Sequence, residues 1–192
     1  MSEQIKSIQW FAVQIRTYHR ANVETSLRNK GYEVFAPSYD VARIVAGRER
    51  KISAPLFPGY IMSAFDAGHR LPVLTVPGVI RILGTSTALT PIPEAEIEAI
   101  RRTIASGLNY EPIESFQPGA PVQVQKGPLA GIRGEVVYHK GKQRLVIKIS
   151  ALNDRAVSVE VDQTIVARLD SAMSFAPGRE AGAASQNYQH AA

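Results

Sequence analysis

The chain is organised around the apolar stretch Leu56-Phe57-Pro58-Gly59-Tyr60-Ile61-Met62, which holds a Pro-Gly pair between two aromatic residues. Proline cannot donate a hydrogen bond within a sheet ladder, and glycine weakens the interior of a strand. The pair therefore predicts a bend or bulge in a strand that redirects Phe57 and Tyr60. From these seven residues alone two interpretations stay open: a kinked strand of the core, or a bend that exposes the aromatic side chains.

The composition limits the class of protein. The chain has 192 residues, is 45% hydrophobic and contains no cysteine. This length can bury one good core or two small ones, and the lack of cysteine excludes a disulfide framework and thiolate metal sites. The start, Met1–Gln9, has no apolar signal-peptide core, and no run approaches the roughly 18 apolar residues of a membrane span. We therefore expect a cytoplasmic protein without membrane contact.

The net charge of +5 is divided into two basic blocks. Residues 1–107 carry +4, residues 108–115 carry −2, and residues 116–170 carry +3. Two mildly basic blocks separated by an acidic strip suggest two domains, each able to lie near nucleic acid. The predicted divisions are an N-terminal domain at 1–107, a linker at 108–116, a second domain at 117–170 and a disordered tail at 171–192.

The N-terminal block mixes strand and helix patterns. Its clearest helix covers residues 93–104, with proline first, acidic residues in the first turn and arginines in the last. The apolar stripe Ile97, Ile100 and Ile104 needs a sheet to cover, which predicts an α/β sandwich with a mainly antiparallel four-stranded sheet. The other predicted elements are strands at 8–15, 32–36 and 79–83, helices at 18–30 and 66–76, and a hairpin at 39–55 that turns at Ala46-Gly47.

The second block shows strand patterns only. Apolar residues alternate with polar ones at Val122 and Val124, and apolar residues recur at every second position at 145–149 and 157–161. Short strands at this spacing indicate a small SH3-like β-barrel, so the predicted fold class is α+β. The preceding segment 108–116, with its proline and acidic residues, has no periodicity and is interpreted as a linker.

Residue patterns of enzymes are missing from the sequence. The four histidines have no partners at metal-ligand spacing, and the glycines near Gly131 are not followed by the Lys-Ser/Thr of a phosphate loop. We therefore expect a protein that is not an enzyme and that needs no cofactor or metal.

Two sets of residues resemble a known family. Residues 122–137, Val-Gln-Val-Gln-Lys-Gly-Pro-Leu-Ala-Gly-Ile-Arg-Gly-Glu-Val-Val, resemble a KOW motif, whose central glycine, here Gly131, allows a tight turn between two strands. KOW motifs also occur in ribosomal proteins. The N-terminal block contains Trp10-Phe11-Ala12-Val13, Phe57-Pro58-Gly59-Tyr60 and Val76-Pro77-Gly78-Val79 in this order, which resembles the N-terminal (NGN) domain of bacterial NusG-type transcription elongation and antitermination factors.

This resemblance covers about residues 8 to 170 and implies a monomeric factor that binds RNA polymerase across its cleft, suppresses pausing and promotes elongation. In the family, the N-terminal domain packs an apolar depression on the clamp helices of the largest subunit and reaches the gate loop of the second-largest subunit. The polymerase-contacting residues that it implies are Trp10, Phe57, Pro58, Gly59, Tyr60, Val79 and Ile80, with His69 and Arg70 at the gate loop.

Basic side chains suggest DNA as a further partner, because phosphates attract arginine and lysine. A cluster of this size is also common on solvated loops. The candidates are Arg16, His19 and Arg20 for the displaced non-template strand, and Arg43, Arg48, Arg50 and Lys51 for the upstream duplex.

The second block departs from the family pattern. General factors carry a Phe-Gly-Arg stretch before the last barrel strand, and its phenylalanine helps the barrel to bind a ribosomal protein or the Rho terminator. Here the stretch is Leu152-Asn153-Asp154-Arg155, which keeps the arginine and lacks the aromatic residue. We expect a specialised paralogue that serves particular operons, whose barrel partner surface is Gly131, Leu152, Asn153 and Arg155. The alternative is a ribosome-associated KOW protein that binds RNA.

Overall fold

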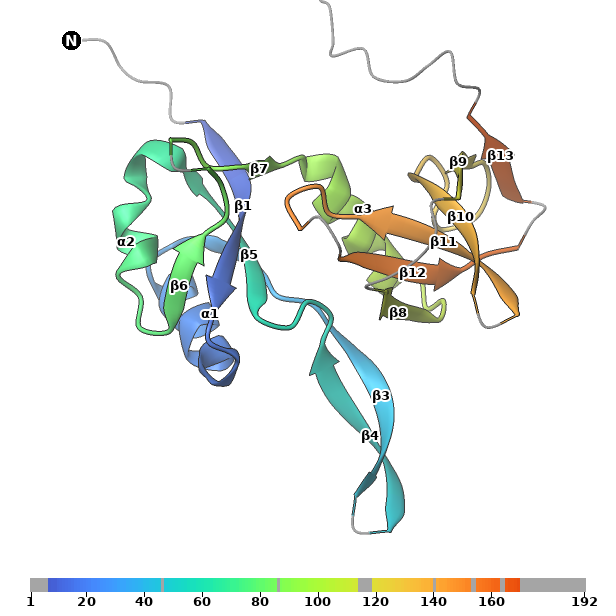
Figure 1. Cartoon of the computed structure of the whole chain (residues 1–192), viewed down its shortest axis with the longest axis horizontal. Coiled ribbons are helices and arrows are strands. Elements are labelled where there is room, and N and C mark those ends of the chain that lie inside the picture. Colours follow the sequence, from blue (N-terminus) through green and yellow to red (C-terminus); the bar gives the residue numbers. More distant parts are fainter. Residues whose placement is uncertain are drawn as a thin grey trace, which may run out of the picture.

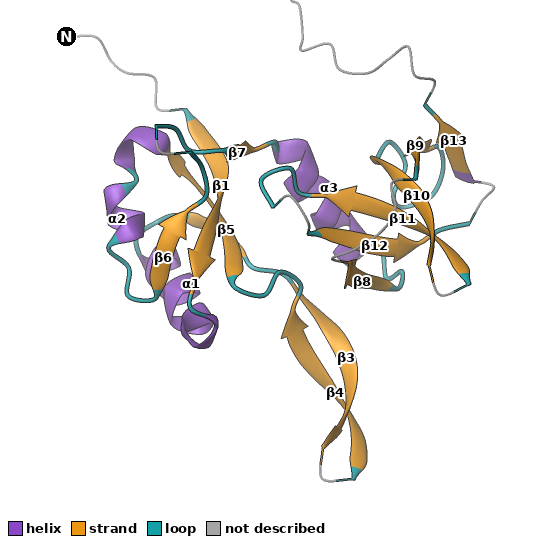
Figure 2. Cartoon of the chain, in the orientation of Figure 1, coloured by secondary structure: helices purple, strands orange, loops and turns teal. Residues whose placement is uncertain are grey.

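The structure, a computed structural model, describes residues 7–45, 47–85, 87–113, 119–139, 141–152, 155–162 and 165–169. Within these residues, the chain forms two larger antiparallel sheets, with a helix between them and a separate two-stranded hairpin (Figure 1; Figure 2). The predicted α+β fold is confirmed. None of the helices in the described residues is long and apolar enough to cross a membrane.

The first sheet has the strand order β2-β5-β1-β6, and β7 also pairs with β1. Every pairing in it is antiparallel, so the predicted four-stranded arrangement is present with one short strand added. Residues 10–13 at the centre of β1 are all apolar and all buried. Because successive side chains point to opposite faces, both faces of this strand are covered. The strands are β1 (Ile8–Ile15), β2 (Glu33–Phe35), β5 (Tyr60–Asp66), β6 (Val79–Ile82) and β7 (Pro91–Ile92).

Short helices cover one face of this sheet. Successive side chains of a strand point to opposite faces, and Phe11, Val13 and Ile15 of β1 pack with Val23 and Leu27 of α1. The η2–α2 segment closes the same core through Val73. It confirms the helix predicted at 66–76. The helices are η1 (Thr17–His19), α1 (Arg20–Asn29), η2 (Ala67–His69) and α2 (Leu71–Leu74).

The Pro58-Gly59 pair lies in a turn between two strands, so the predicted bend within one strand is wrong. Gly59 has a φ of 80°, and the Tyr60 amide donates to the Phe57 carbonyl at 3.1 Å. Proline followed by a glycine with positive φ is typical of a type II turn. The Ile15 amide donates to the Gly59 carbonyl at 2.9 Å, which fixes the turn against the end of β1.

The hairpin consists of β3 (Ser38–Val45) and β4 (Arg48–Pro55), which pair only with each other. It extends away from the body of the molecule (Figure 1). The predicted hairpin and its turn are confirmed, although Ala46 itself lies outside the described residues.

The second sheet has the order β13-β9-β10-β11-β12-β8 and is antiparallel throughout. Its β8 lies within the predicted linker, which corrects that expectation. Ile113 of β8 packs with Val137, Val146 and Ala156, and Pro112 is tolerated because β8 is an edge strand. The strands are β8 (Tyr110–Ile113), β9 (Ala120–Val124), β10 (Arg133–His139), β11 (Lys142–Lys148), β12 (Ala156–Glu160) and β13 (Val166–Arg168).

Helix α3 (Glu94–Ala105) lies between the two sheets (Figure 1). Its predicted apolar stripe, Ile97 and Ile100 with Ile104 partly buried, belongs to a core that contains residues of both sheets. Arg102 Nη2 donates to the carbonyls of Pro128 and Ala130, both at 2.8 Å. The helix therefore joins the two sheets, whereas the sequence analysis assigned it to the first alone. The predicted tail at 171–192 lies outside the described residues.

Candidate interaction surfaces

The aromatic residues expected to face a partner are covered in this structure. Trp10 is 5% exposed, Phe57 is 2% exposed, and Tyr60 is half-buried. Trp10 and Phe57 belong to the same core as Leu145 of β11 and Leu152 of the loop between β11 and β12. The expectation that Phe57 is exposed is therefore wrong for this arrangement, because the second sheet and α3 cover the face of the first sheet that holds these aromatics.

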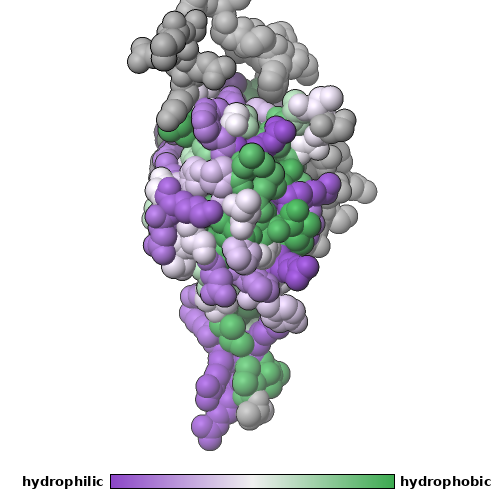
Figure 3. Space-filling view, turned by 90° about the vertical axis from the view of Figure 1, so that its left-hand side faces the viewer, coloured by the Kyte–Doolittle hydropathy of each residue, from purple (hydrophilic) through white to green (hydrophobic). Residues whose placement is uncertain are grey.

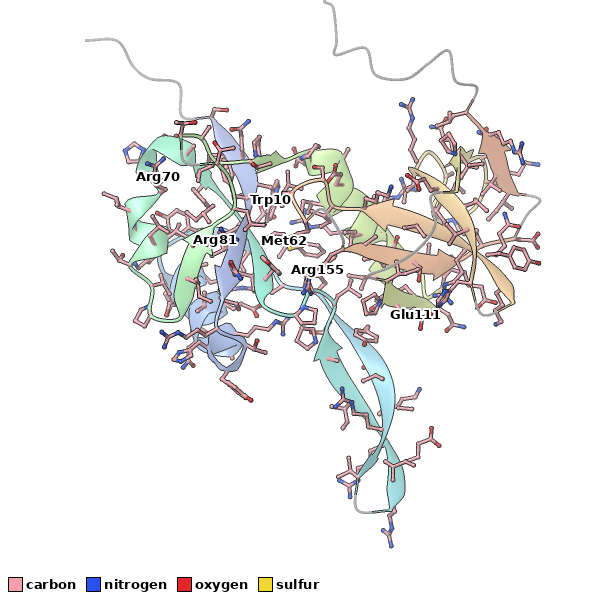
Figure 4. The ribbon with its side chains drawn as sticks, viewed as in Figure 1. Trp10, Met62, Arg70, Arg81, Glu111 and Arg155 are labelled. Carbon is pink, nitrogen blue, oxygen red and sulfur yellow. The ribbon has the colours of Figure 1, made fainter. Side chains whose placement is uncertain are left out.

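Arg155 connects the second sheet to the Pro58-Gly59 turn. Its Nη1 donates to the Pro58 carbonyl at 3.1 Å, and its guanidinium carbon lies 5.2 Å from the centre of the Tyr60 ring. Figure 4 shows Arg155 between the second sheet and the start of β5. A guanidinium within about 6 Å of an aromatic ring is attracted to the ring face. Arg155, predicted as part of a partner surface of the barrel, thus contacts two residues predicted to bind the polymerase.

Further hydrogen bonds join the second sheet and its β11–β12 loop to the hairpin and to α3. The Ser150 amide and Oγ both donate to Glu96 Oε2 of α3, at 2.8 and 3.2 Å. The Tyr110 hydroxyl donates to the Ser38 carbonyl at 3.1 Å, and burial, with a contribution from the Asp40 charge, raises the pKa of Tyr110. A cleft of about 380 Å³ is lined by Tyr60, Arg81, Leu83, Gly84, Thr90, Ser150, Ala151, Leu152 and Arg155.

The remaining residues of the predicted barrel surface have different positions. Leu152 is 4% exposed and is part of the core between the sheets. Gly131 is exposed with a φ of 85°, and its amide donates to the Val124 carbonyl, so it closes the turn between β9 and β10 as the KOW resemblance implies. Asn153 lies outside the described residues.

A second candidate surface lies on α2 and β6. His69 and Arg70 are both exposed, and His69 Nδ1 lies 2.9 Å from Asp66 Oδ2. Ile80 is 53% exposed and Val79 is half-buried. Leu71, which the sequence analysis did not single out, is 70% exposed. Figure 3 faces this side of the molecule and shows hydrophobic side chains gathered on it.

The basic residues after β1 divide into two groups. Arg16 is exposed, Tyr18 is fully exposed, and His19 is half-buried. Arg20, in contrast, donates from Nη2 to the carbonyls of Ala36 and Pro37. Arg20 therefore holds the chain segment before β3 in place. The sequence analysis named Arg20 only as a candidate DNA contact and did not anticipate these bonds. Tyr18 was missed because the sequence pattern placed it inside a helix.

The basic residues of the hairpin are all exposed: Arg43, Arg48, Arg50 and Lys51. No ion pair of these four residues occurs in the described part of the chain. They are free to contact an anionic partner. In the same described residues, no group of three His, Asp or Glu side chains is arranged to hold a metal.

Comparison with known proteins relates this arrangement to one family. The family model described as "Transcription termination factor nusG" matches residues 8–101. The transcription termination/antitermination protein NusG of Escherichia coli K12 is 34% identical over 179 residues, covering 84% of this chain and 96% of the relative. The proteins of the same name from Pasteurella multocida and Buchnera aphidicola are 31% and 30% identical, covering 84% and 80% of this chain and 96% and 92% of the relatives.

Among solved structures, one described as "Domain interaction in Thermotoga maritima NusG" matches with a TM-score of 0.46 and 17% identity, covering 85% of this chain and 98% of that one. The sequence identity to these relatives, which extends over most of both chains, defines the class of protein. The chain belongs to the NusG family of transcription termination/antitermination proteins.

Proposed function

We propose that this protein is a non-enzymatic elongation factor that binds RNA polymerase through the face of its first sheet. The observation that carries the proposal is the convergence of Trp10, Phe57 and the Phe57-to-Tyr60 turn on one apolar face. Aromatic residues dominate protein interfaces, and truncating one often costs about 2 kcal/mol or more of binding free energy. Family membership supports a role in transcription, and the clamp helices of the largest subunit are the proposed partner.

This binding requires the second sheet to leave the first. Trp10 and Phe57 have too little exposed surface to contact a partner while Leu152 and Arg155 cover them. The protein therefore exists in a closed form, described here, and an open form that binds polymerase. A partner that binds only the open form shifts the population toward it. The proposed units are residues 1–107 and 117–170, which act as separate domains of a monomer.

The other surfaces extend the contact. His69 and Arg70 are exposed, as are Leu71 and Ile80, and we propose that this surface contacts the gate loop of the second-largest subunit. Arg16 and His19 are proposed to face non-template DNA, and the hairpin is proposed to face upstream duplex. Bridging both sides of the polymerase cleft keeps it closed on the nucleic acids, which suppresses pausing on particular operons.

The experiment is retention of pure full-length protein on immobilised RNA polymerase, followed by single-round transcription on a template with a strong pause. Binding with shorter pauses is the expected result. Crosslinking to ribosomal RNA with no retention on polymerase would favour the ribosome-associated alternative instead. Val79→Ala is a suitable variant for both measurements. Val79 is one of the residues expected to contact polymerase, and because it is only half-buried its truncation removes little of the core.

A further inference from the structure

The cleft of about 380 Å³ lies where the first sheet meets the loop between β11 and β12. One wall consists of Tyr60 and of residues at and after the end of β6, and the other wall belongs to the β11–β12 loop. Binding sites for small molecules commonly measure about 300–1,000 Å³. The described residues that line the cleft include two arginines, Arg81 and Arg155, and no acidic residue. The cleft therefore favours a small anion.

The strand register places Arg81 on the same face of the first sheet as Tyr60. Gln14 of β1 pairs with Tyr60 of β5 on one side and with Arg81 of β6 on the other. Directly opposite residues share a face and neighbouring strands are about 4.8 Å apart, so the backbones at Tyr60 and Arg81 are roughly 10 Å apart. The guanidinium carbon of Arg155 lies 5.2 Å from the centre of the Tyr60 ring. Two cationic groups, both labelled in Figure 4, thus approach the cleft along one row of residues.

Arg81 is oriented within the sheet and keeps donors for a ligand. It is exposed, and its Nε donates to Gln14 Oε1 at 2.8 Å. Within the described part of the chain, its two terminal nitrogens have no hydrogen bond or ion pair. A guanidinium binds phosphate oxygens through two parallel hydrogen bonds, and a group that is already oriented loses less freedom on binding. Arg81 is therefore a preformed contact for a phosphate group.

The other polar groups of the cleft are compatible with an anion. Thr90 is exposed on the same wall as Arg81 and supplies a hydroxyl donor. Ser150 does not add one, because its amide and Oγ both donate to Glu96 Oε2. This carboxylate approaches the cleft from α3, and its accepted bonds direct it to Ser150.

We propose that this cleft binds a small ligand that carries a diphosphate group, with Arg81 and Arg155 as its cationic contacts. Two guanidinium groups that approach from opposite walls match the two phosphates better than a single phosphate, which would reach one of them at a time. The ligand also stabilises the closed form, and this part of the inference rests on the proposed function.

The link to the closed form follows from the origin of the two arginines. Arg81 belongs to the first sheet and Arg155 to the loop before β12, so the site is complete only while the two are in contact. A ligand that binds one form shifts the population toward that form, and polymerase is proposed to bind the other form. At 100 times its dissociation constant, the ligand favours the closed form by a factor of about 100. The apparent affinity for polymerase falls by up to the same factor.

The test is isothermal titration calorimetry of the full-length protein with pyrophosphate and with adenosine diphosphate, in buffer without magnesium. Arg81→Gln is expected to weaken binding of both probes roughly tenfold or more, because it removes a charged hydrogen-bond donor pair. Arg133→Gln is the matched control: it removes the same charge from an exposed residue of β10 that does not line the cleft, and its binding should stay within about twofold of the wild type. Equal affinities for the two probes would show that the diphosphate group alone is recognised, and tighter binding of adenosine diphosphate would show that the nucleoside contributes as well.

Two further measurements separate binding from folding and from the closed form. The melting temperature of Arg81→Gln without ligand should equal that of the wild type, because Arg81 is exposed and its bond to Gln14 lies at the surface. Saturating pyrophosphate should reduce retention of the wild type on immobilised polymerase, and should leave retention of Arg81→Gln unchanged. Sodium chloride at the same ionic strength controls for electrostatic screening.

The inference is overturned if neither probe shows saturable binding. Equal losses for Arg81→Gln and Arg133→Gln would also overturn it, because they would indicate general attraction of anions to a basic chain. Saturable binding that leaves wild-type retention on polymerase unchanged would refute the coupling to the closed form. If the wild type is not retained on polymerase even without ligand, the proposed function fails, whereas the calorimetric comparison of the variants still decides whether the cleft is a diphosphate site.

Discussion

The guanidinium carbon of Arg155 lies 5.2 Å from the centre of the Tyr60 ring, and its Nη1 donates to the Pro58 carbonyl beside that ring. One residue of the loop before β12 therefore contacts the turn through which the first sheet is proposed to bind polymerase. Under the proposed function, the closed form and the polymerase complex compete for Tyr60. Weakening this contact should change polymerase binding without altering the polymerase surface.

We expect Arg155→Ala to increase affinity for polymerase. A hydrogen bond contributes about 1 kcal/mol and a cation–π contact about 0.5–1 kcal/mol, so their loss shifts the closed-to-open equilibrium by up to roughly thirtyfold. If the closed form dominates, apparent affinity rises by a similar factor. Titration of labelled protein with polymerase measures the change.

The control for that variant is Arg133→Ala, which removes an exposed arginine of β10. Its effect on affinity should be negligible. Unchanged or weaker binding of Arg155→Ala, with a normal melting curve, would show that the second sheet does not compete with polymerase.

Glu96→Ala should act in the same direction through a different contact. Glu96 Oε2 accepts two hydrogen bonds from Ser150, and the variant leaves both donors without this acceptor. Because Glu96 is on α3 and remote in sequence from the Phe57 turn, an increase in polymerase affinity would come from opening. Small-angle scattering of the free variant is expected to show a larger radius of gyration than the wild type; an unchanged radius contradicts the prediction.

Phe57→Ala is expected to damage the fold as well as binding. The sequence analysis treats Phe57 as an exposed anchor, but burial at 2% exposure makes its truncation cost about 3–5 kcal/mol of unfolding free energy. Phe57→Leu keeps most of the buried volume and is the better probe of the interface. Chemical denaturation measures the stability of both variants, and polymerase retention of Phe57→Leu is compared with that of wild type at matched folded fraction.

Tyr110 predicts a pH dependence at the contact between the sheets. Burial raises its pKa above the usual 10.0. The folded state then holds the phenolic proton more tightly than the unfolded state, so the stabilisation is complete below pH 10 and is lost as pH rises through the raised pKa. Tyr110→Phe should lose about 1 kcal/mol at pH 7, with the bond to Ser38, and should show a shallower alkaline decline. Denaturation series from pH 7 to 11 test both effects; a decline as steep as that of the wild type would assign it to other groups.

The local elements of this fold follow from the sequence because their signals are local. The 94–105 helix has proline before it, acidic residues in its first turn and an arginine in its last, and the hairpin has β-prone residues around Gly47. The sequence analysis predicted a bend within one strand at Pro58-Gly59, whereas the structure has a turn between two strands. A Pro-Gly pair is compatible with both, so the two residues alone do not distinguish them. The strand β8 was missed because edge pairing supplies hydrogen bonds that its proline and its one acidic residue, Glu111, do not predict.

The candidate site was only partly predictable for a different reason. The sequence identifies Trp10, Phe57 and Tyr60 as a group, but an exposed interface and a domain contact use the same apolar residues. Only non-local packing shows that Leu152 and Arg155 cover them. Likewise, the bonds of Arg20 to Ala36 and Pro37 join residues 16 and 17 positions apart, and a charge pattern cannot distinguish this use from a DNA contact.

The last prediction is that the protein promotes elongation without assisting Rho. Asn153, an amide, stands where the family carries the barrel aromatic. The neighbouring apolar residue, Leu152, is buried against the first sheet at 4% exposure, so it offers no anchor in the closed form. The lack of an aromatic side chain costs about 2 kcal/mol of binding free energy, or roughly thirtyfold in affinity, even after opening. Single-round transcription on a template with one strong pause and one Rho-dependent terminator should show shorter pausing and unchanged or reduced termination. Leu152→Phe is not a neutral gain-of-function variant, because the larger ring overpacks the core, so purified Rho binding to Glu96→Ala serves as the second measurement. Enhanced termination with wild-type protein, or Rho binding that increases when Glu96→Ala opens the molecule, would show that the second sheet recruits Rho without that aromatic residue.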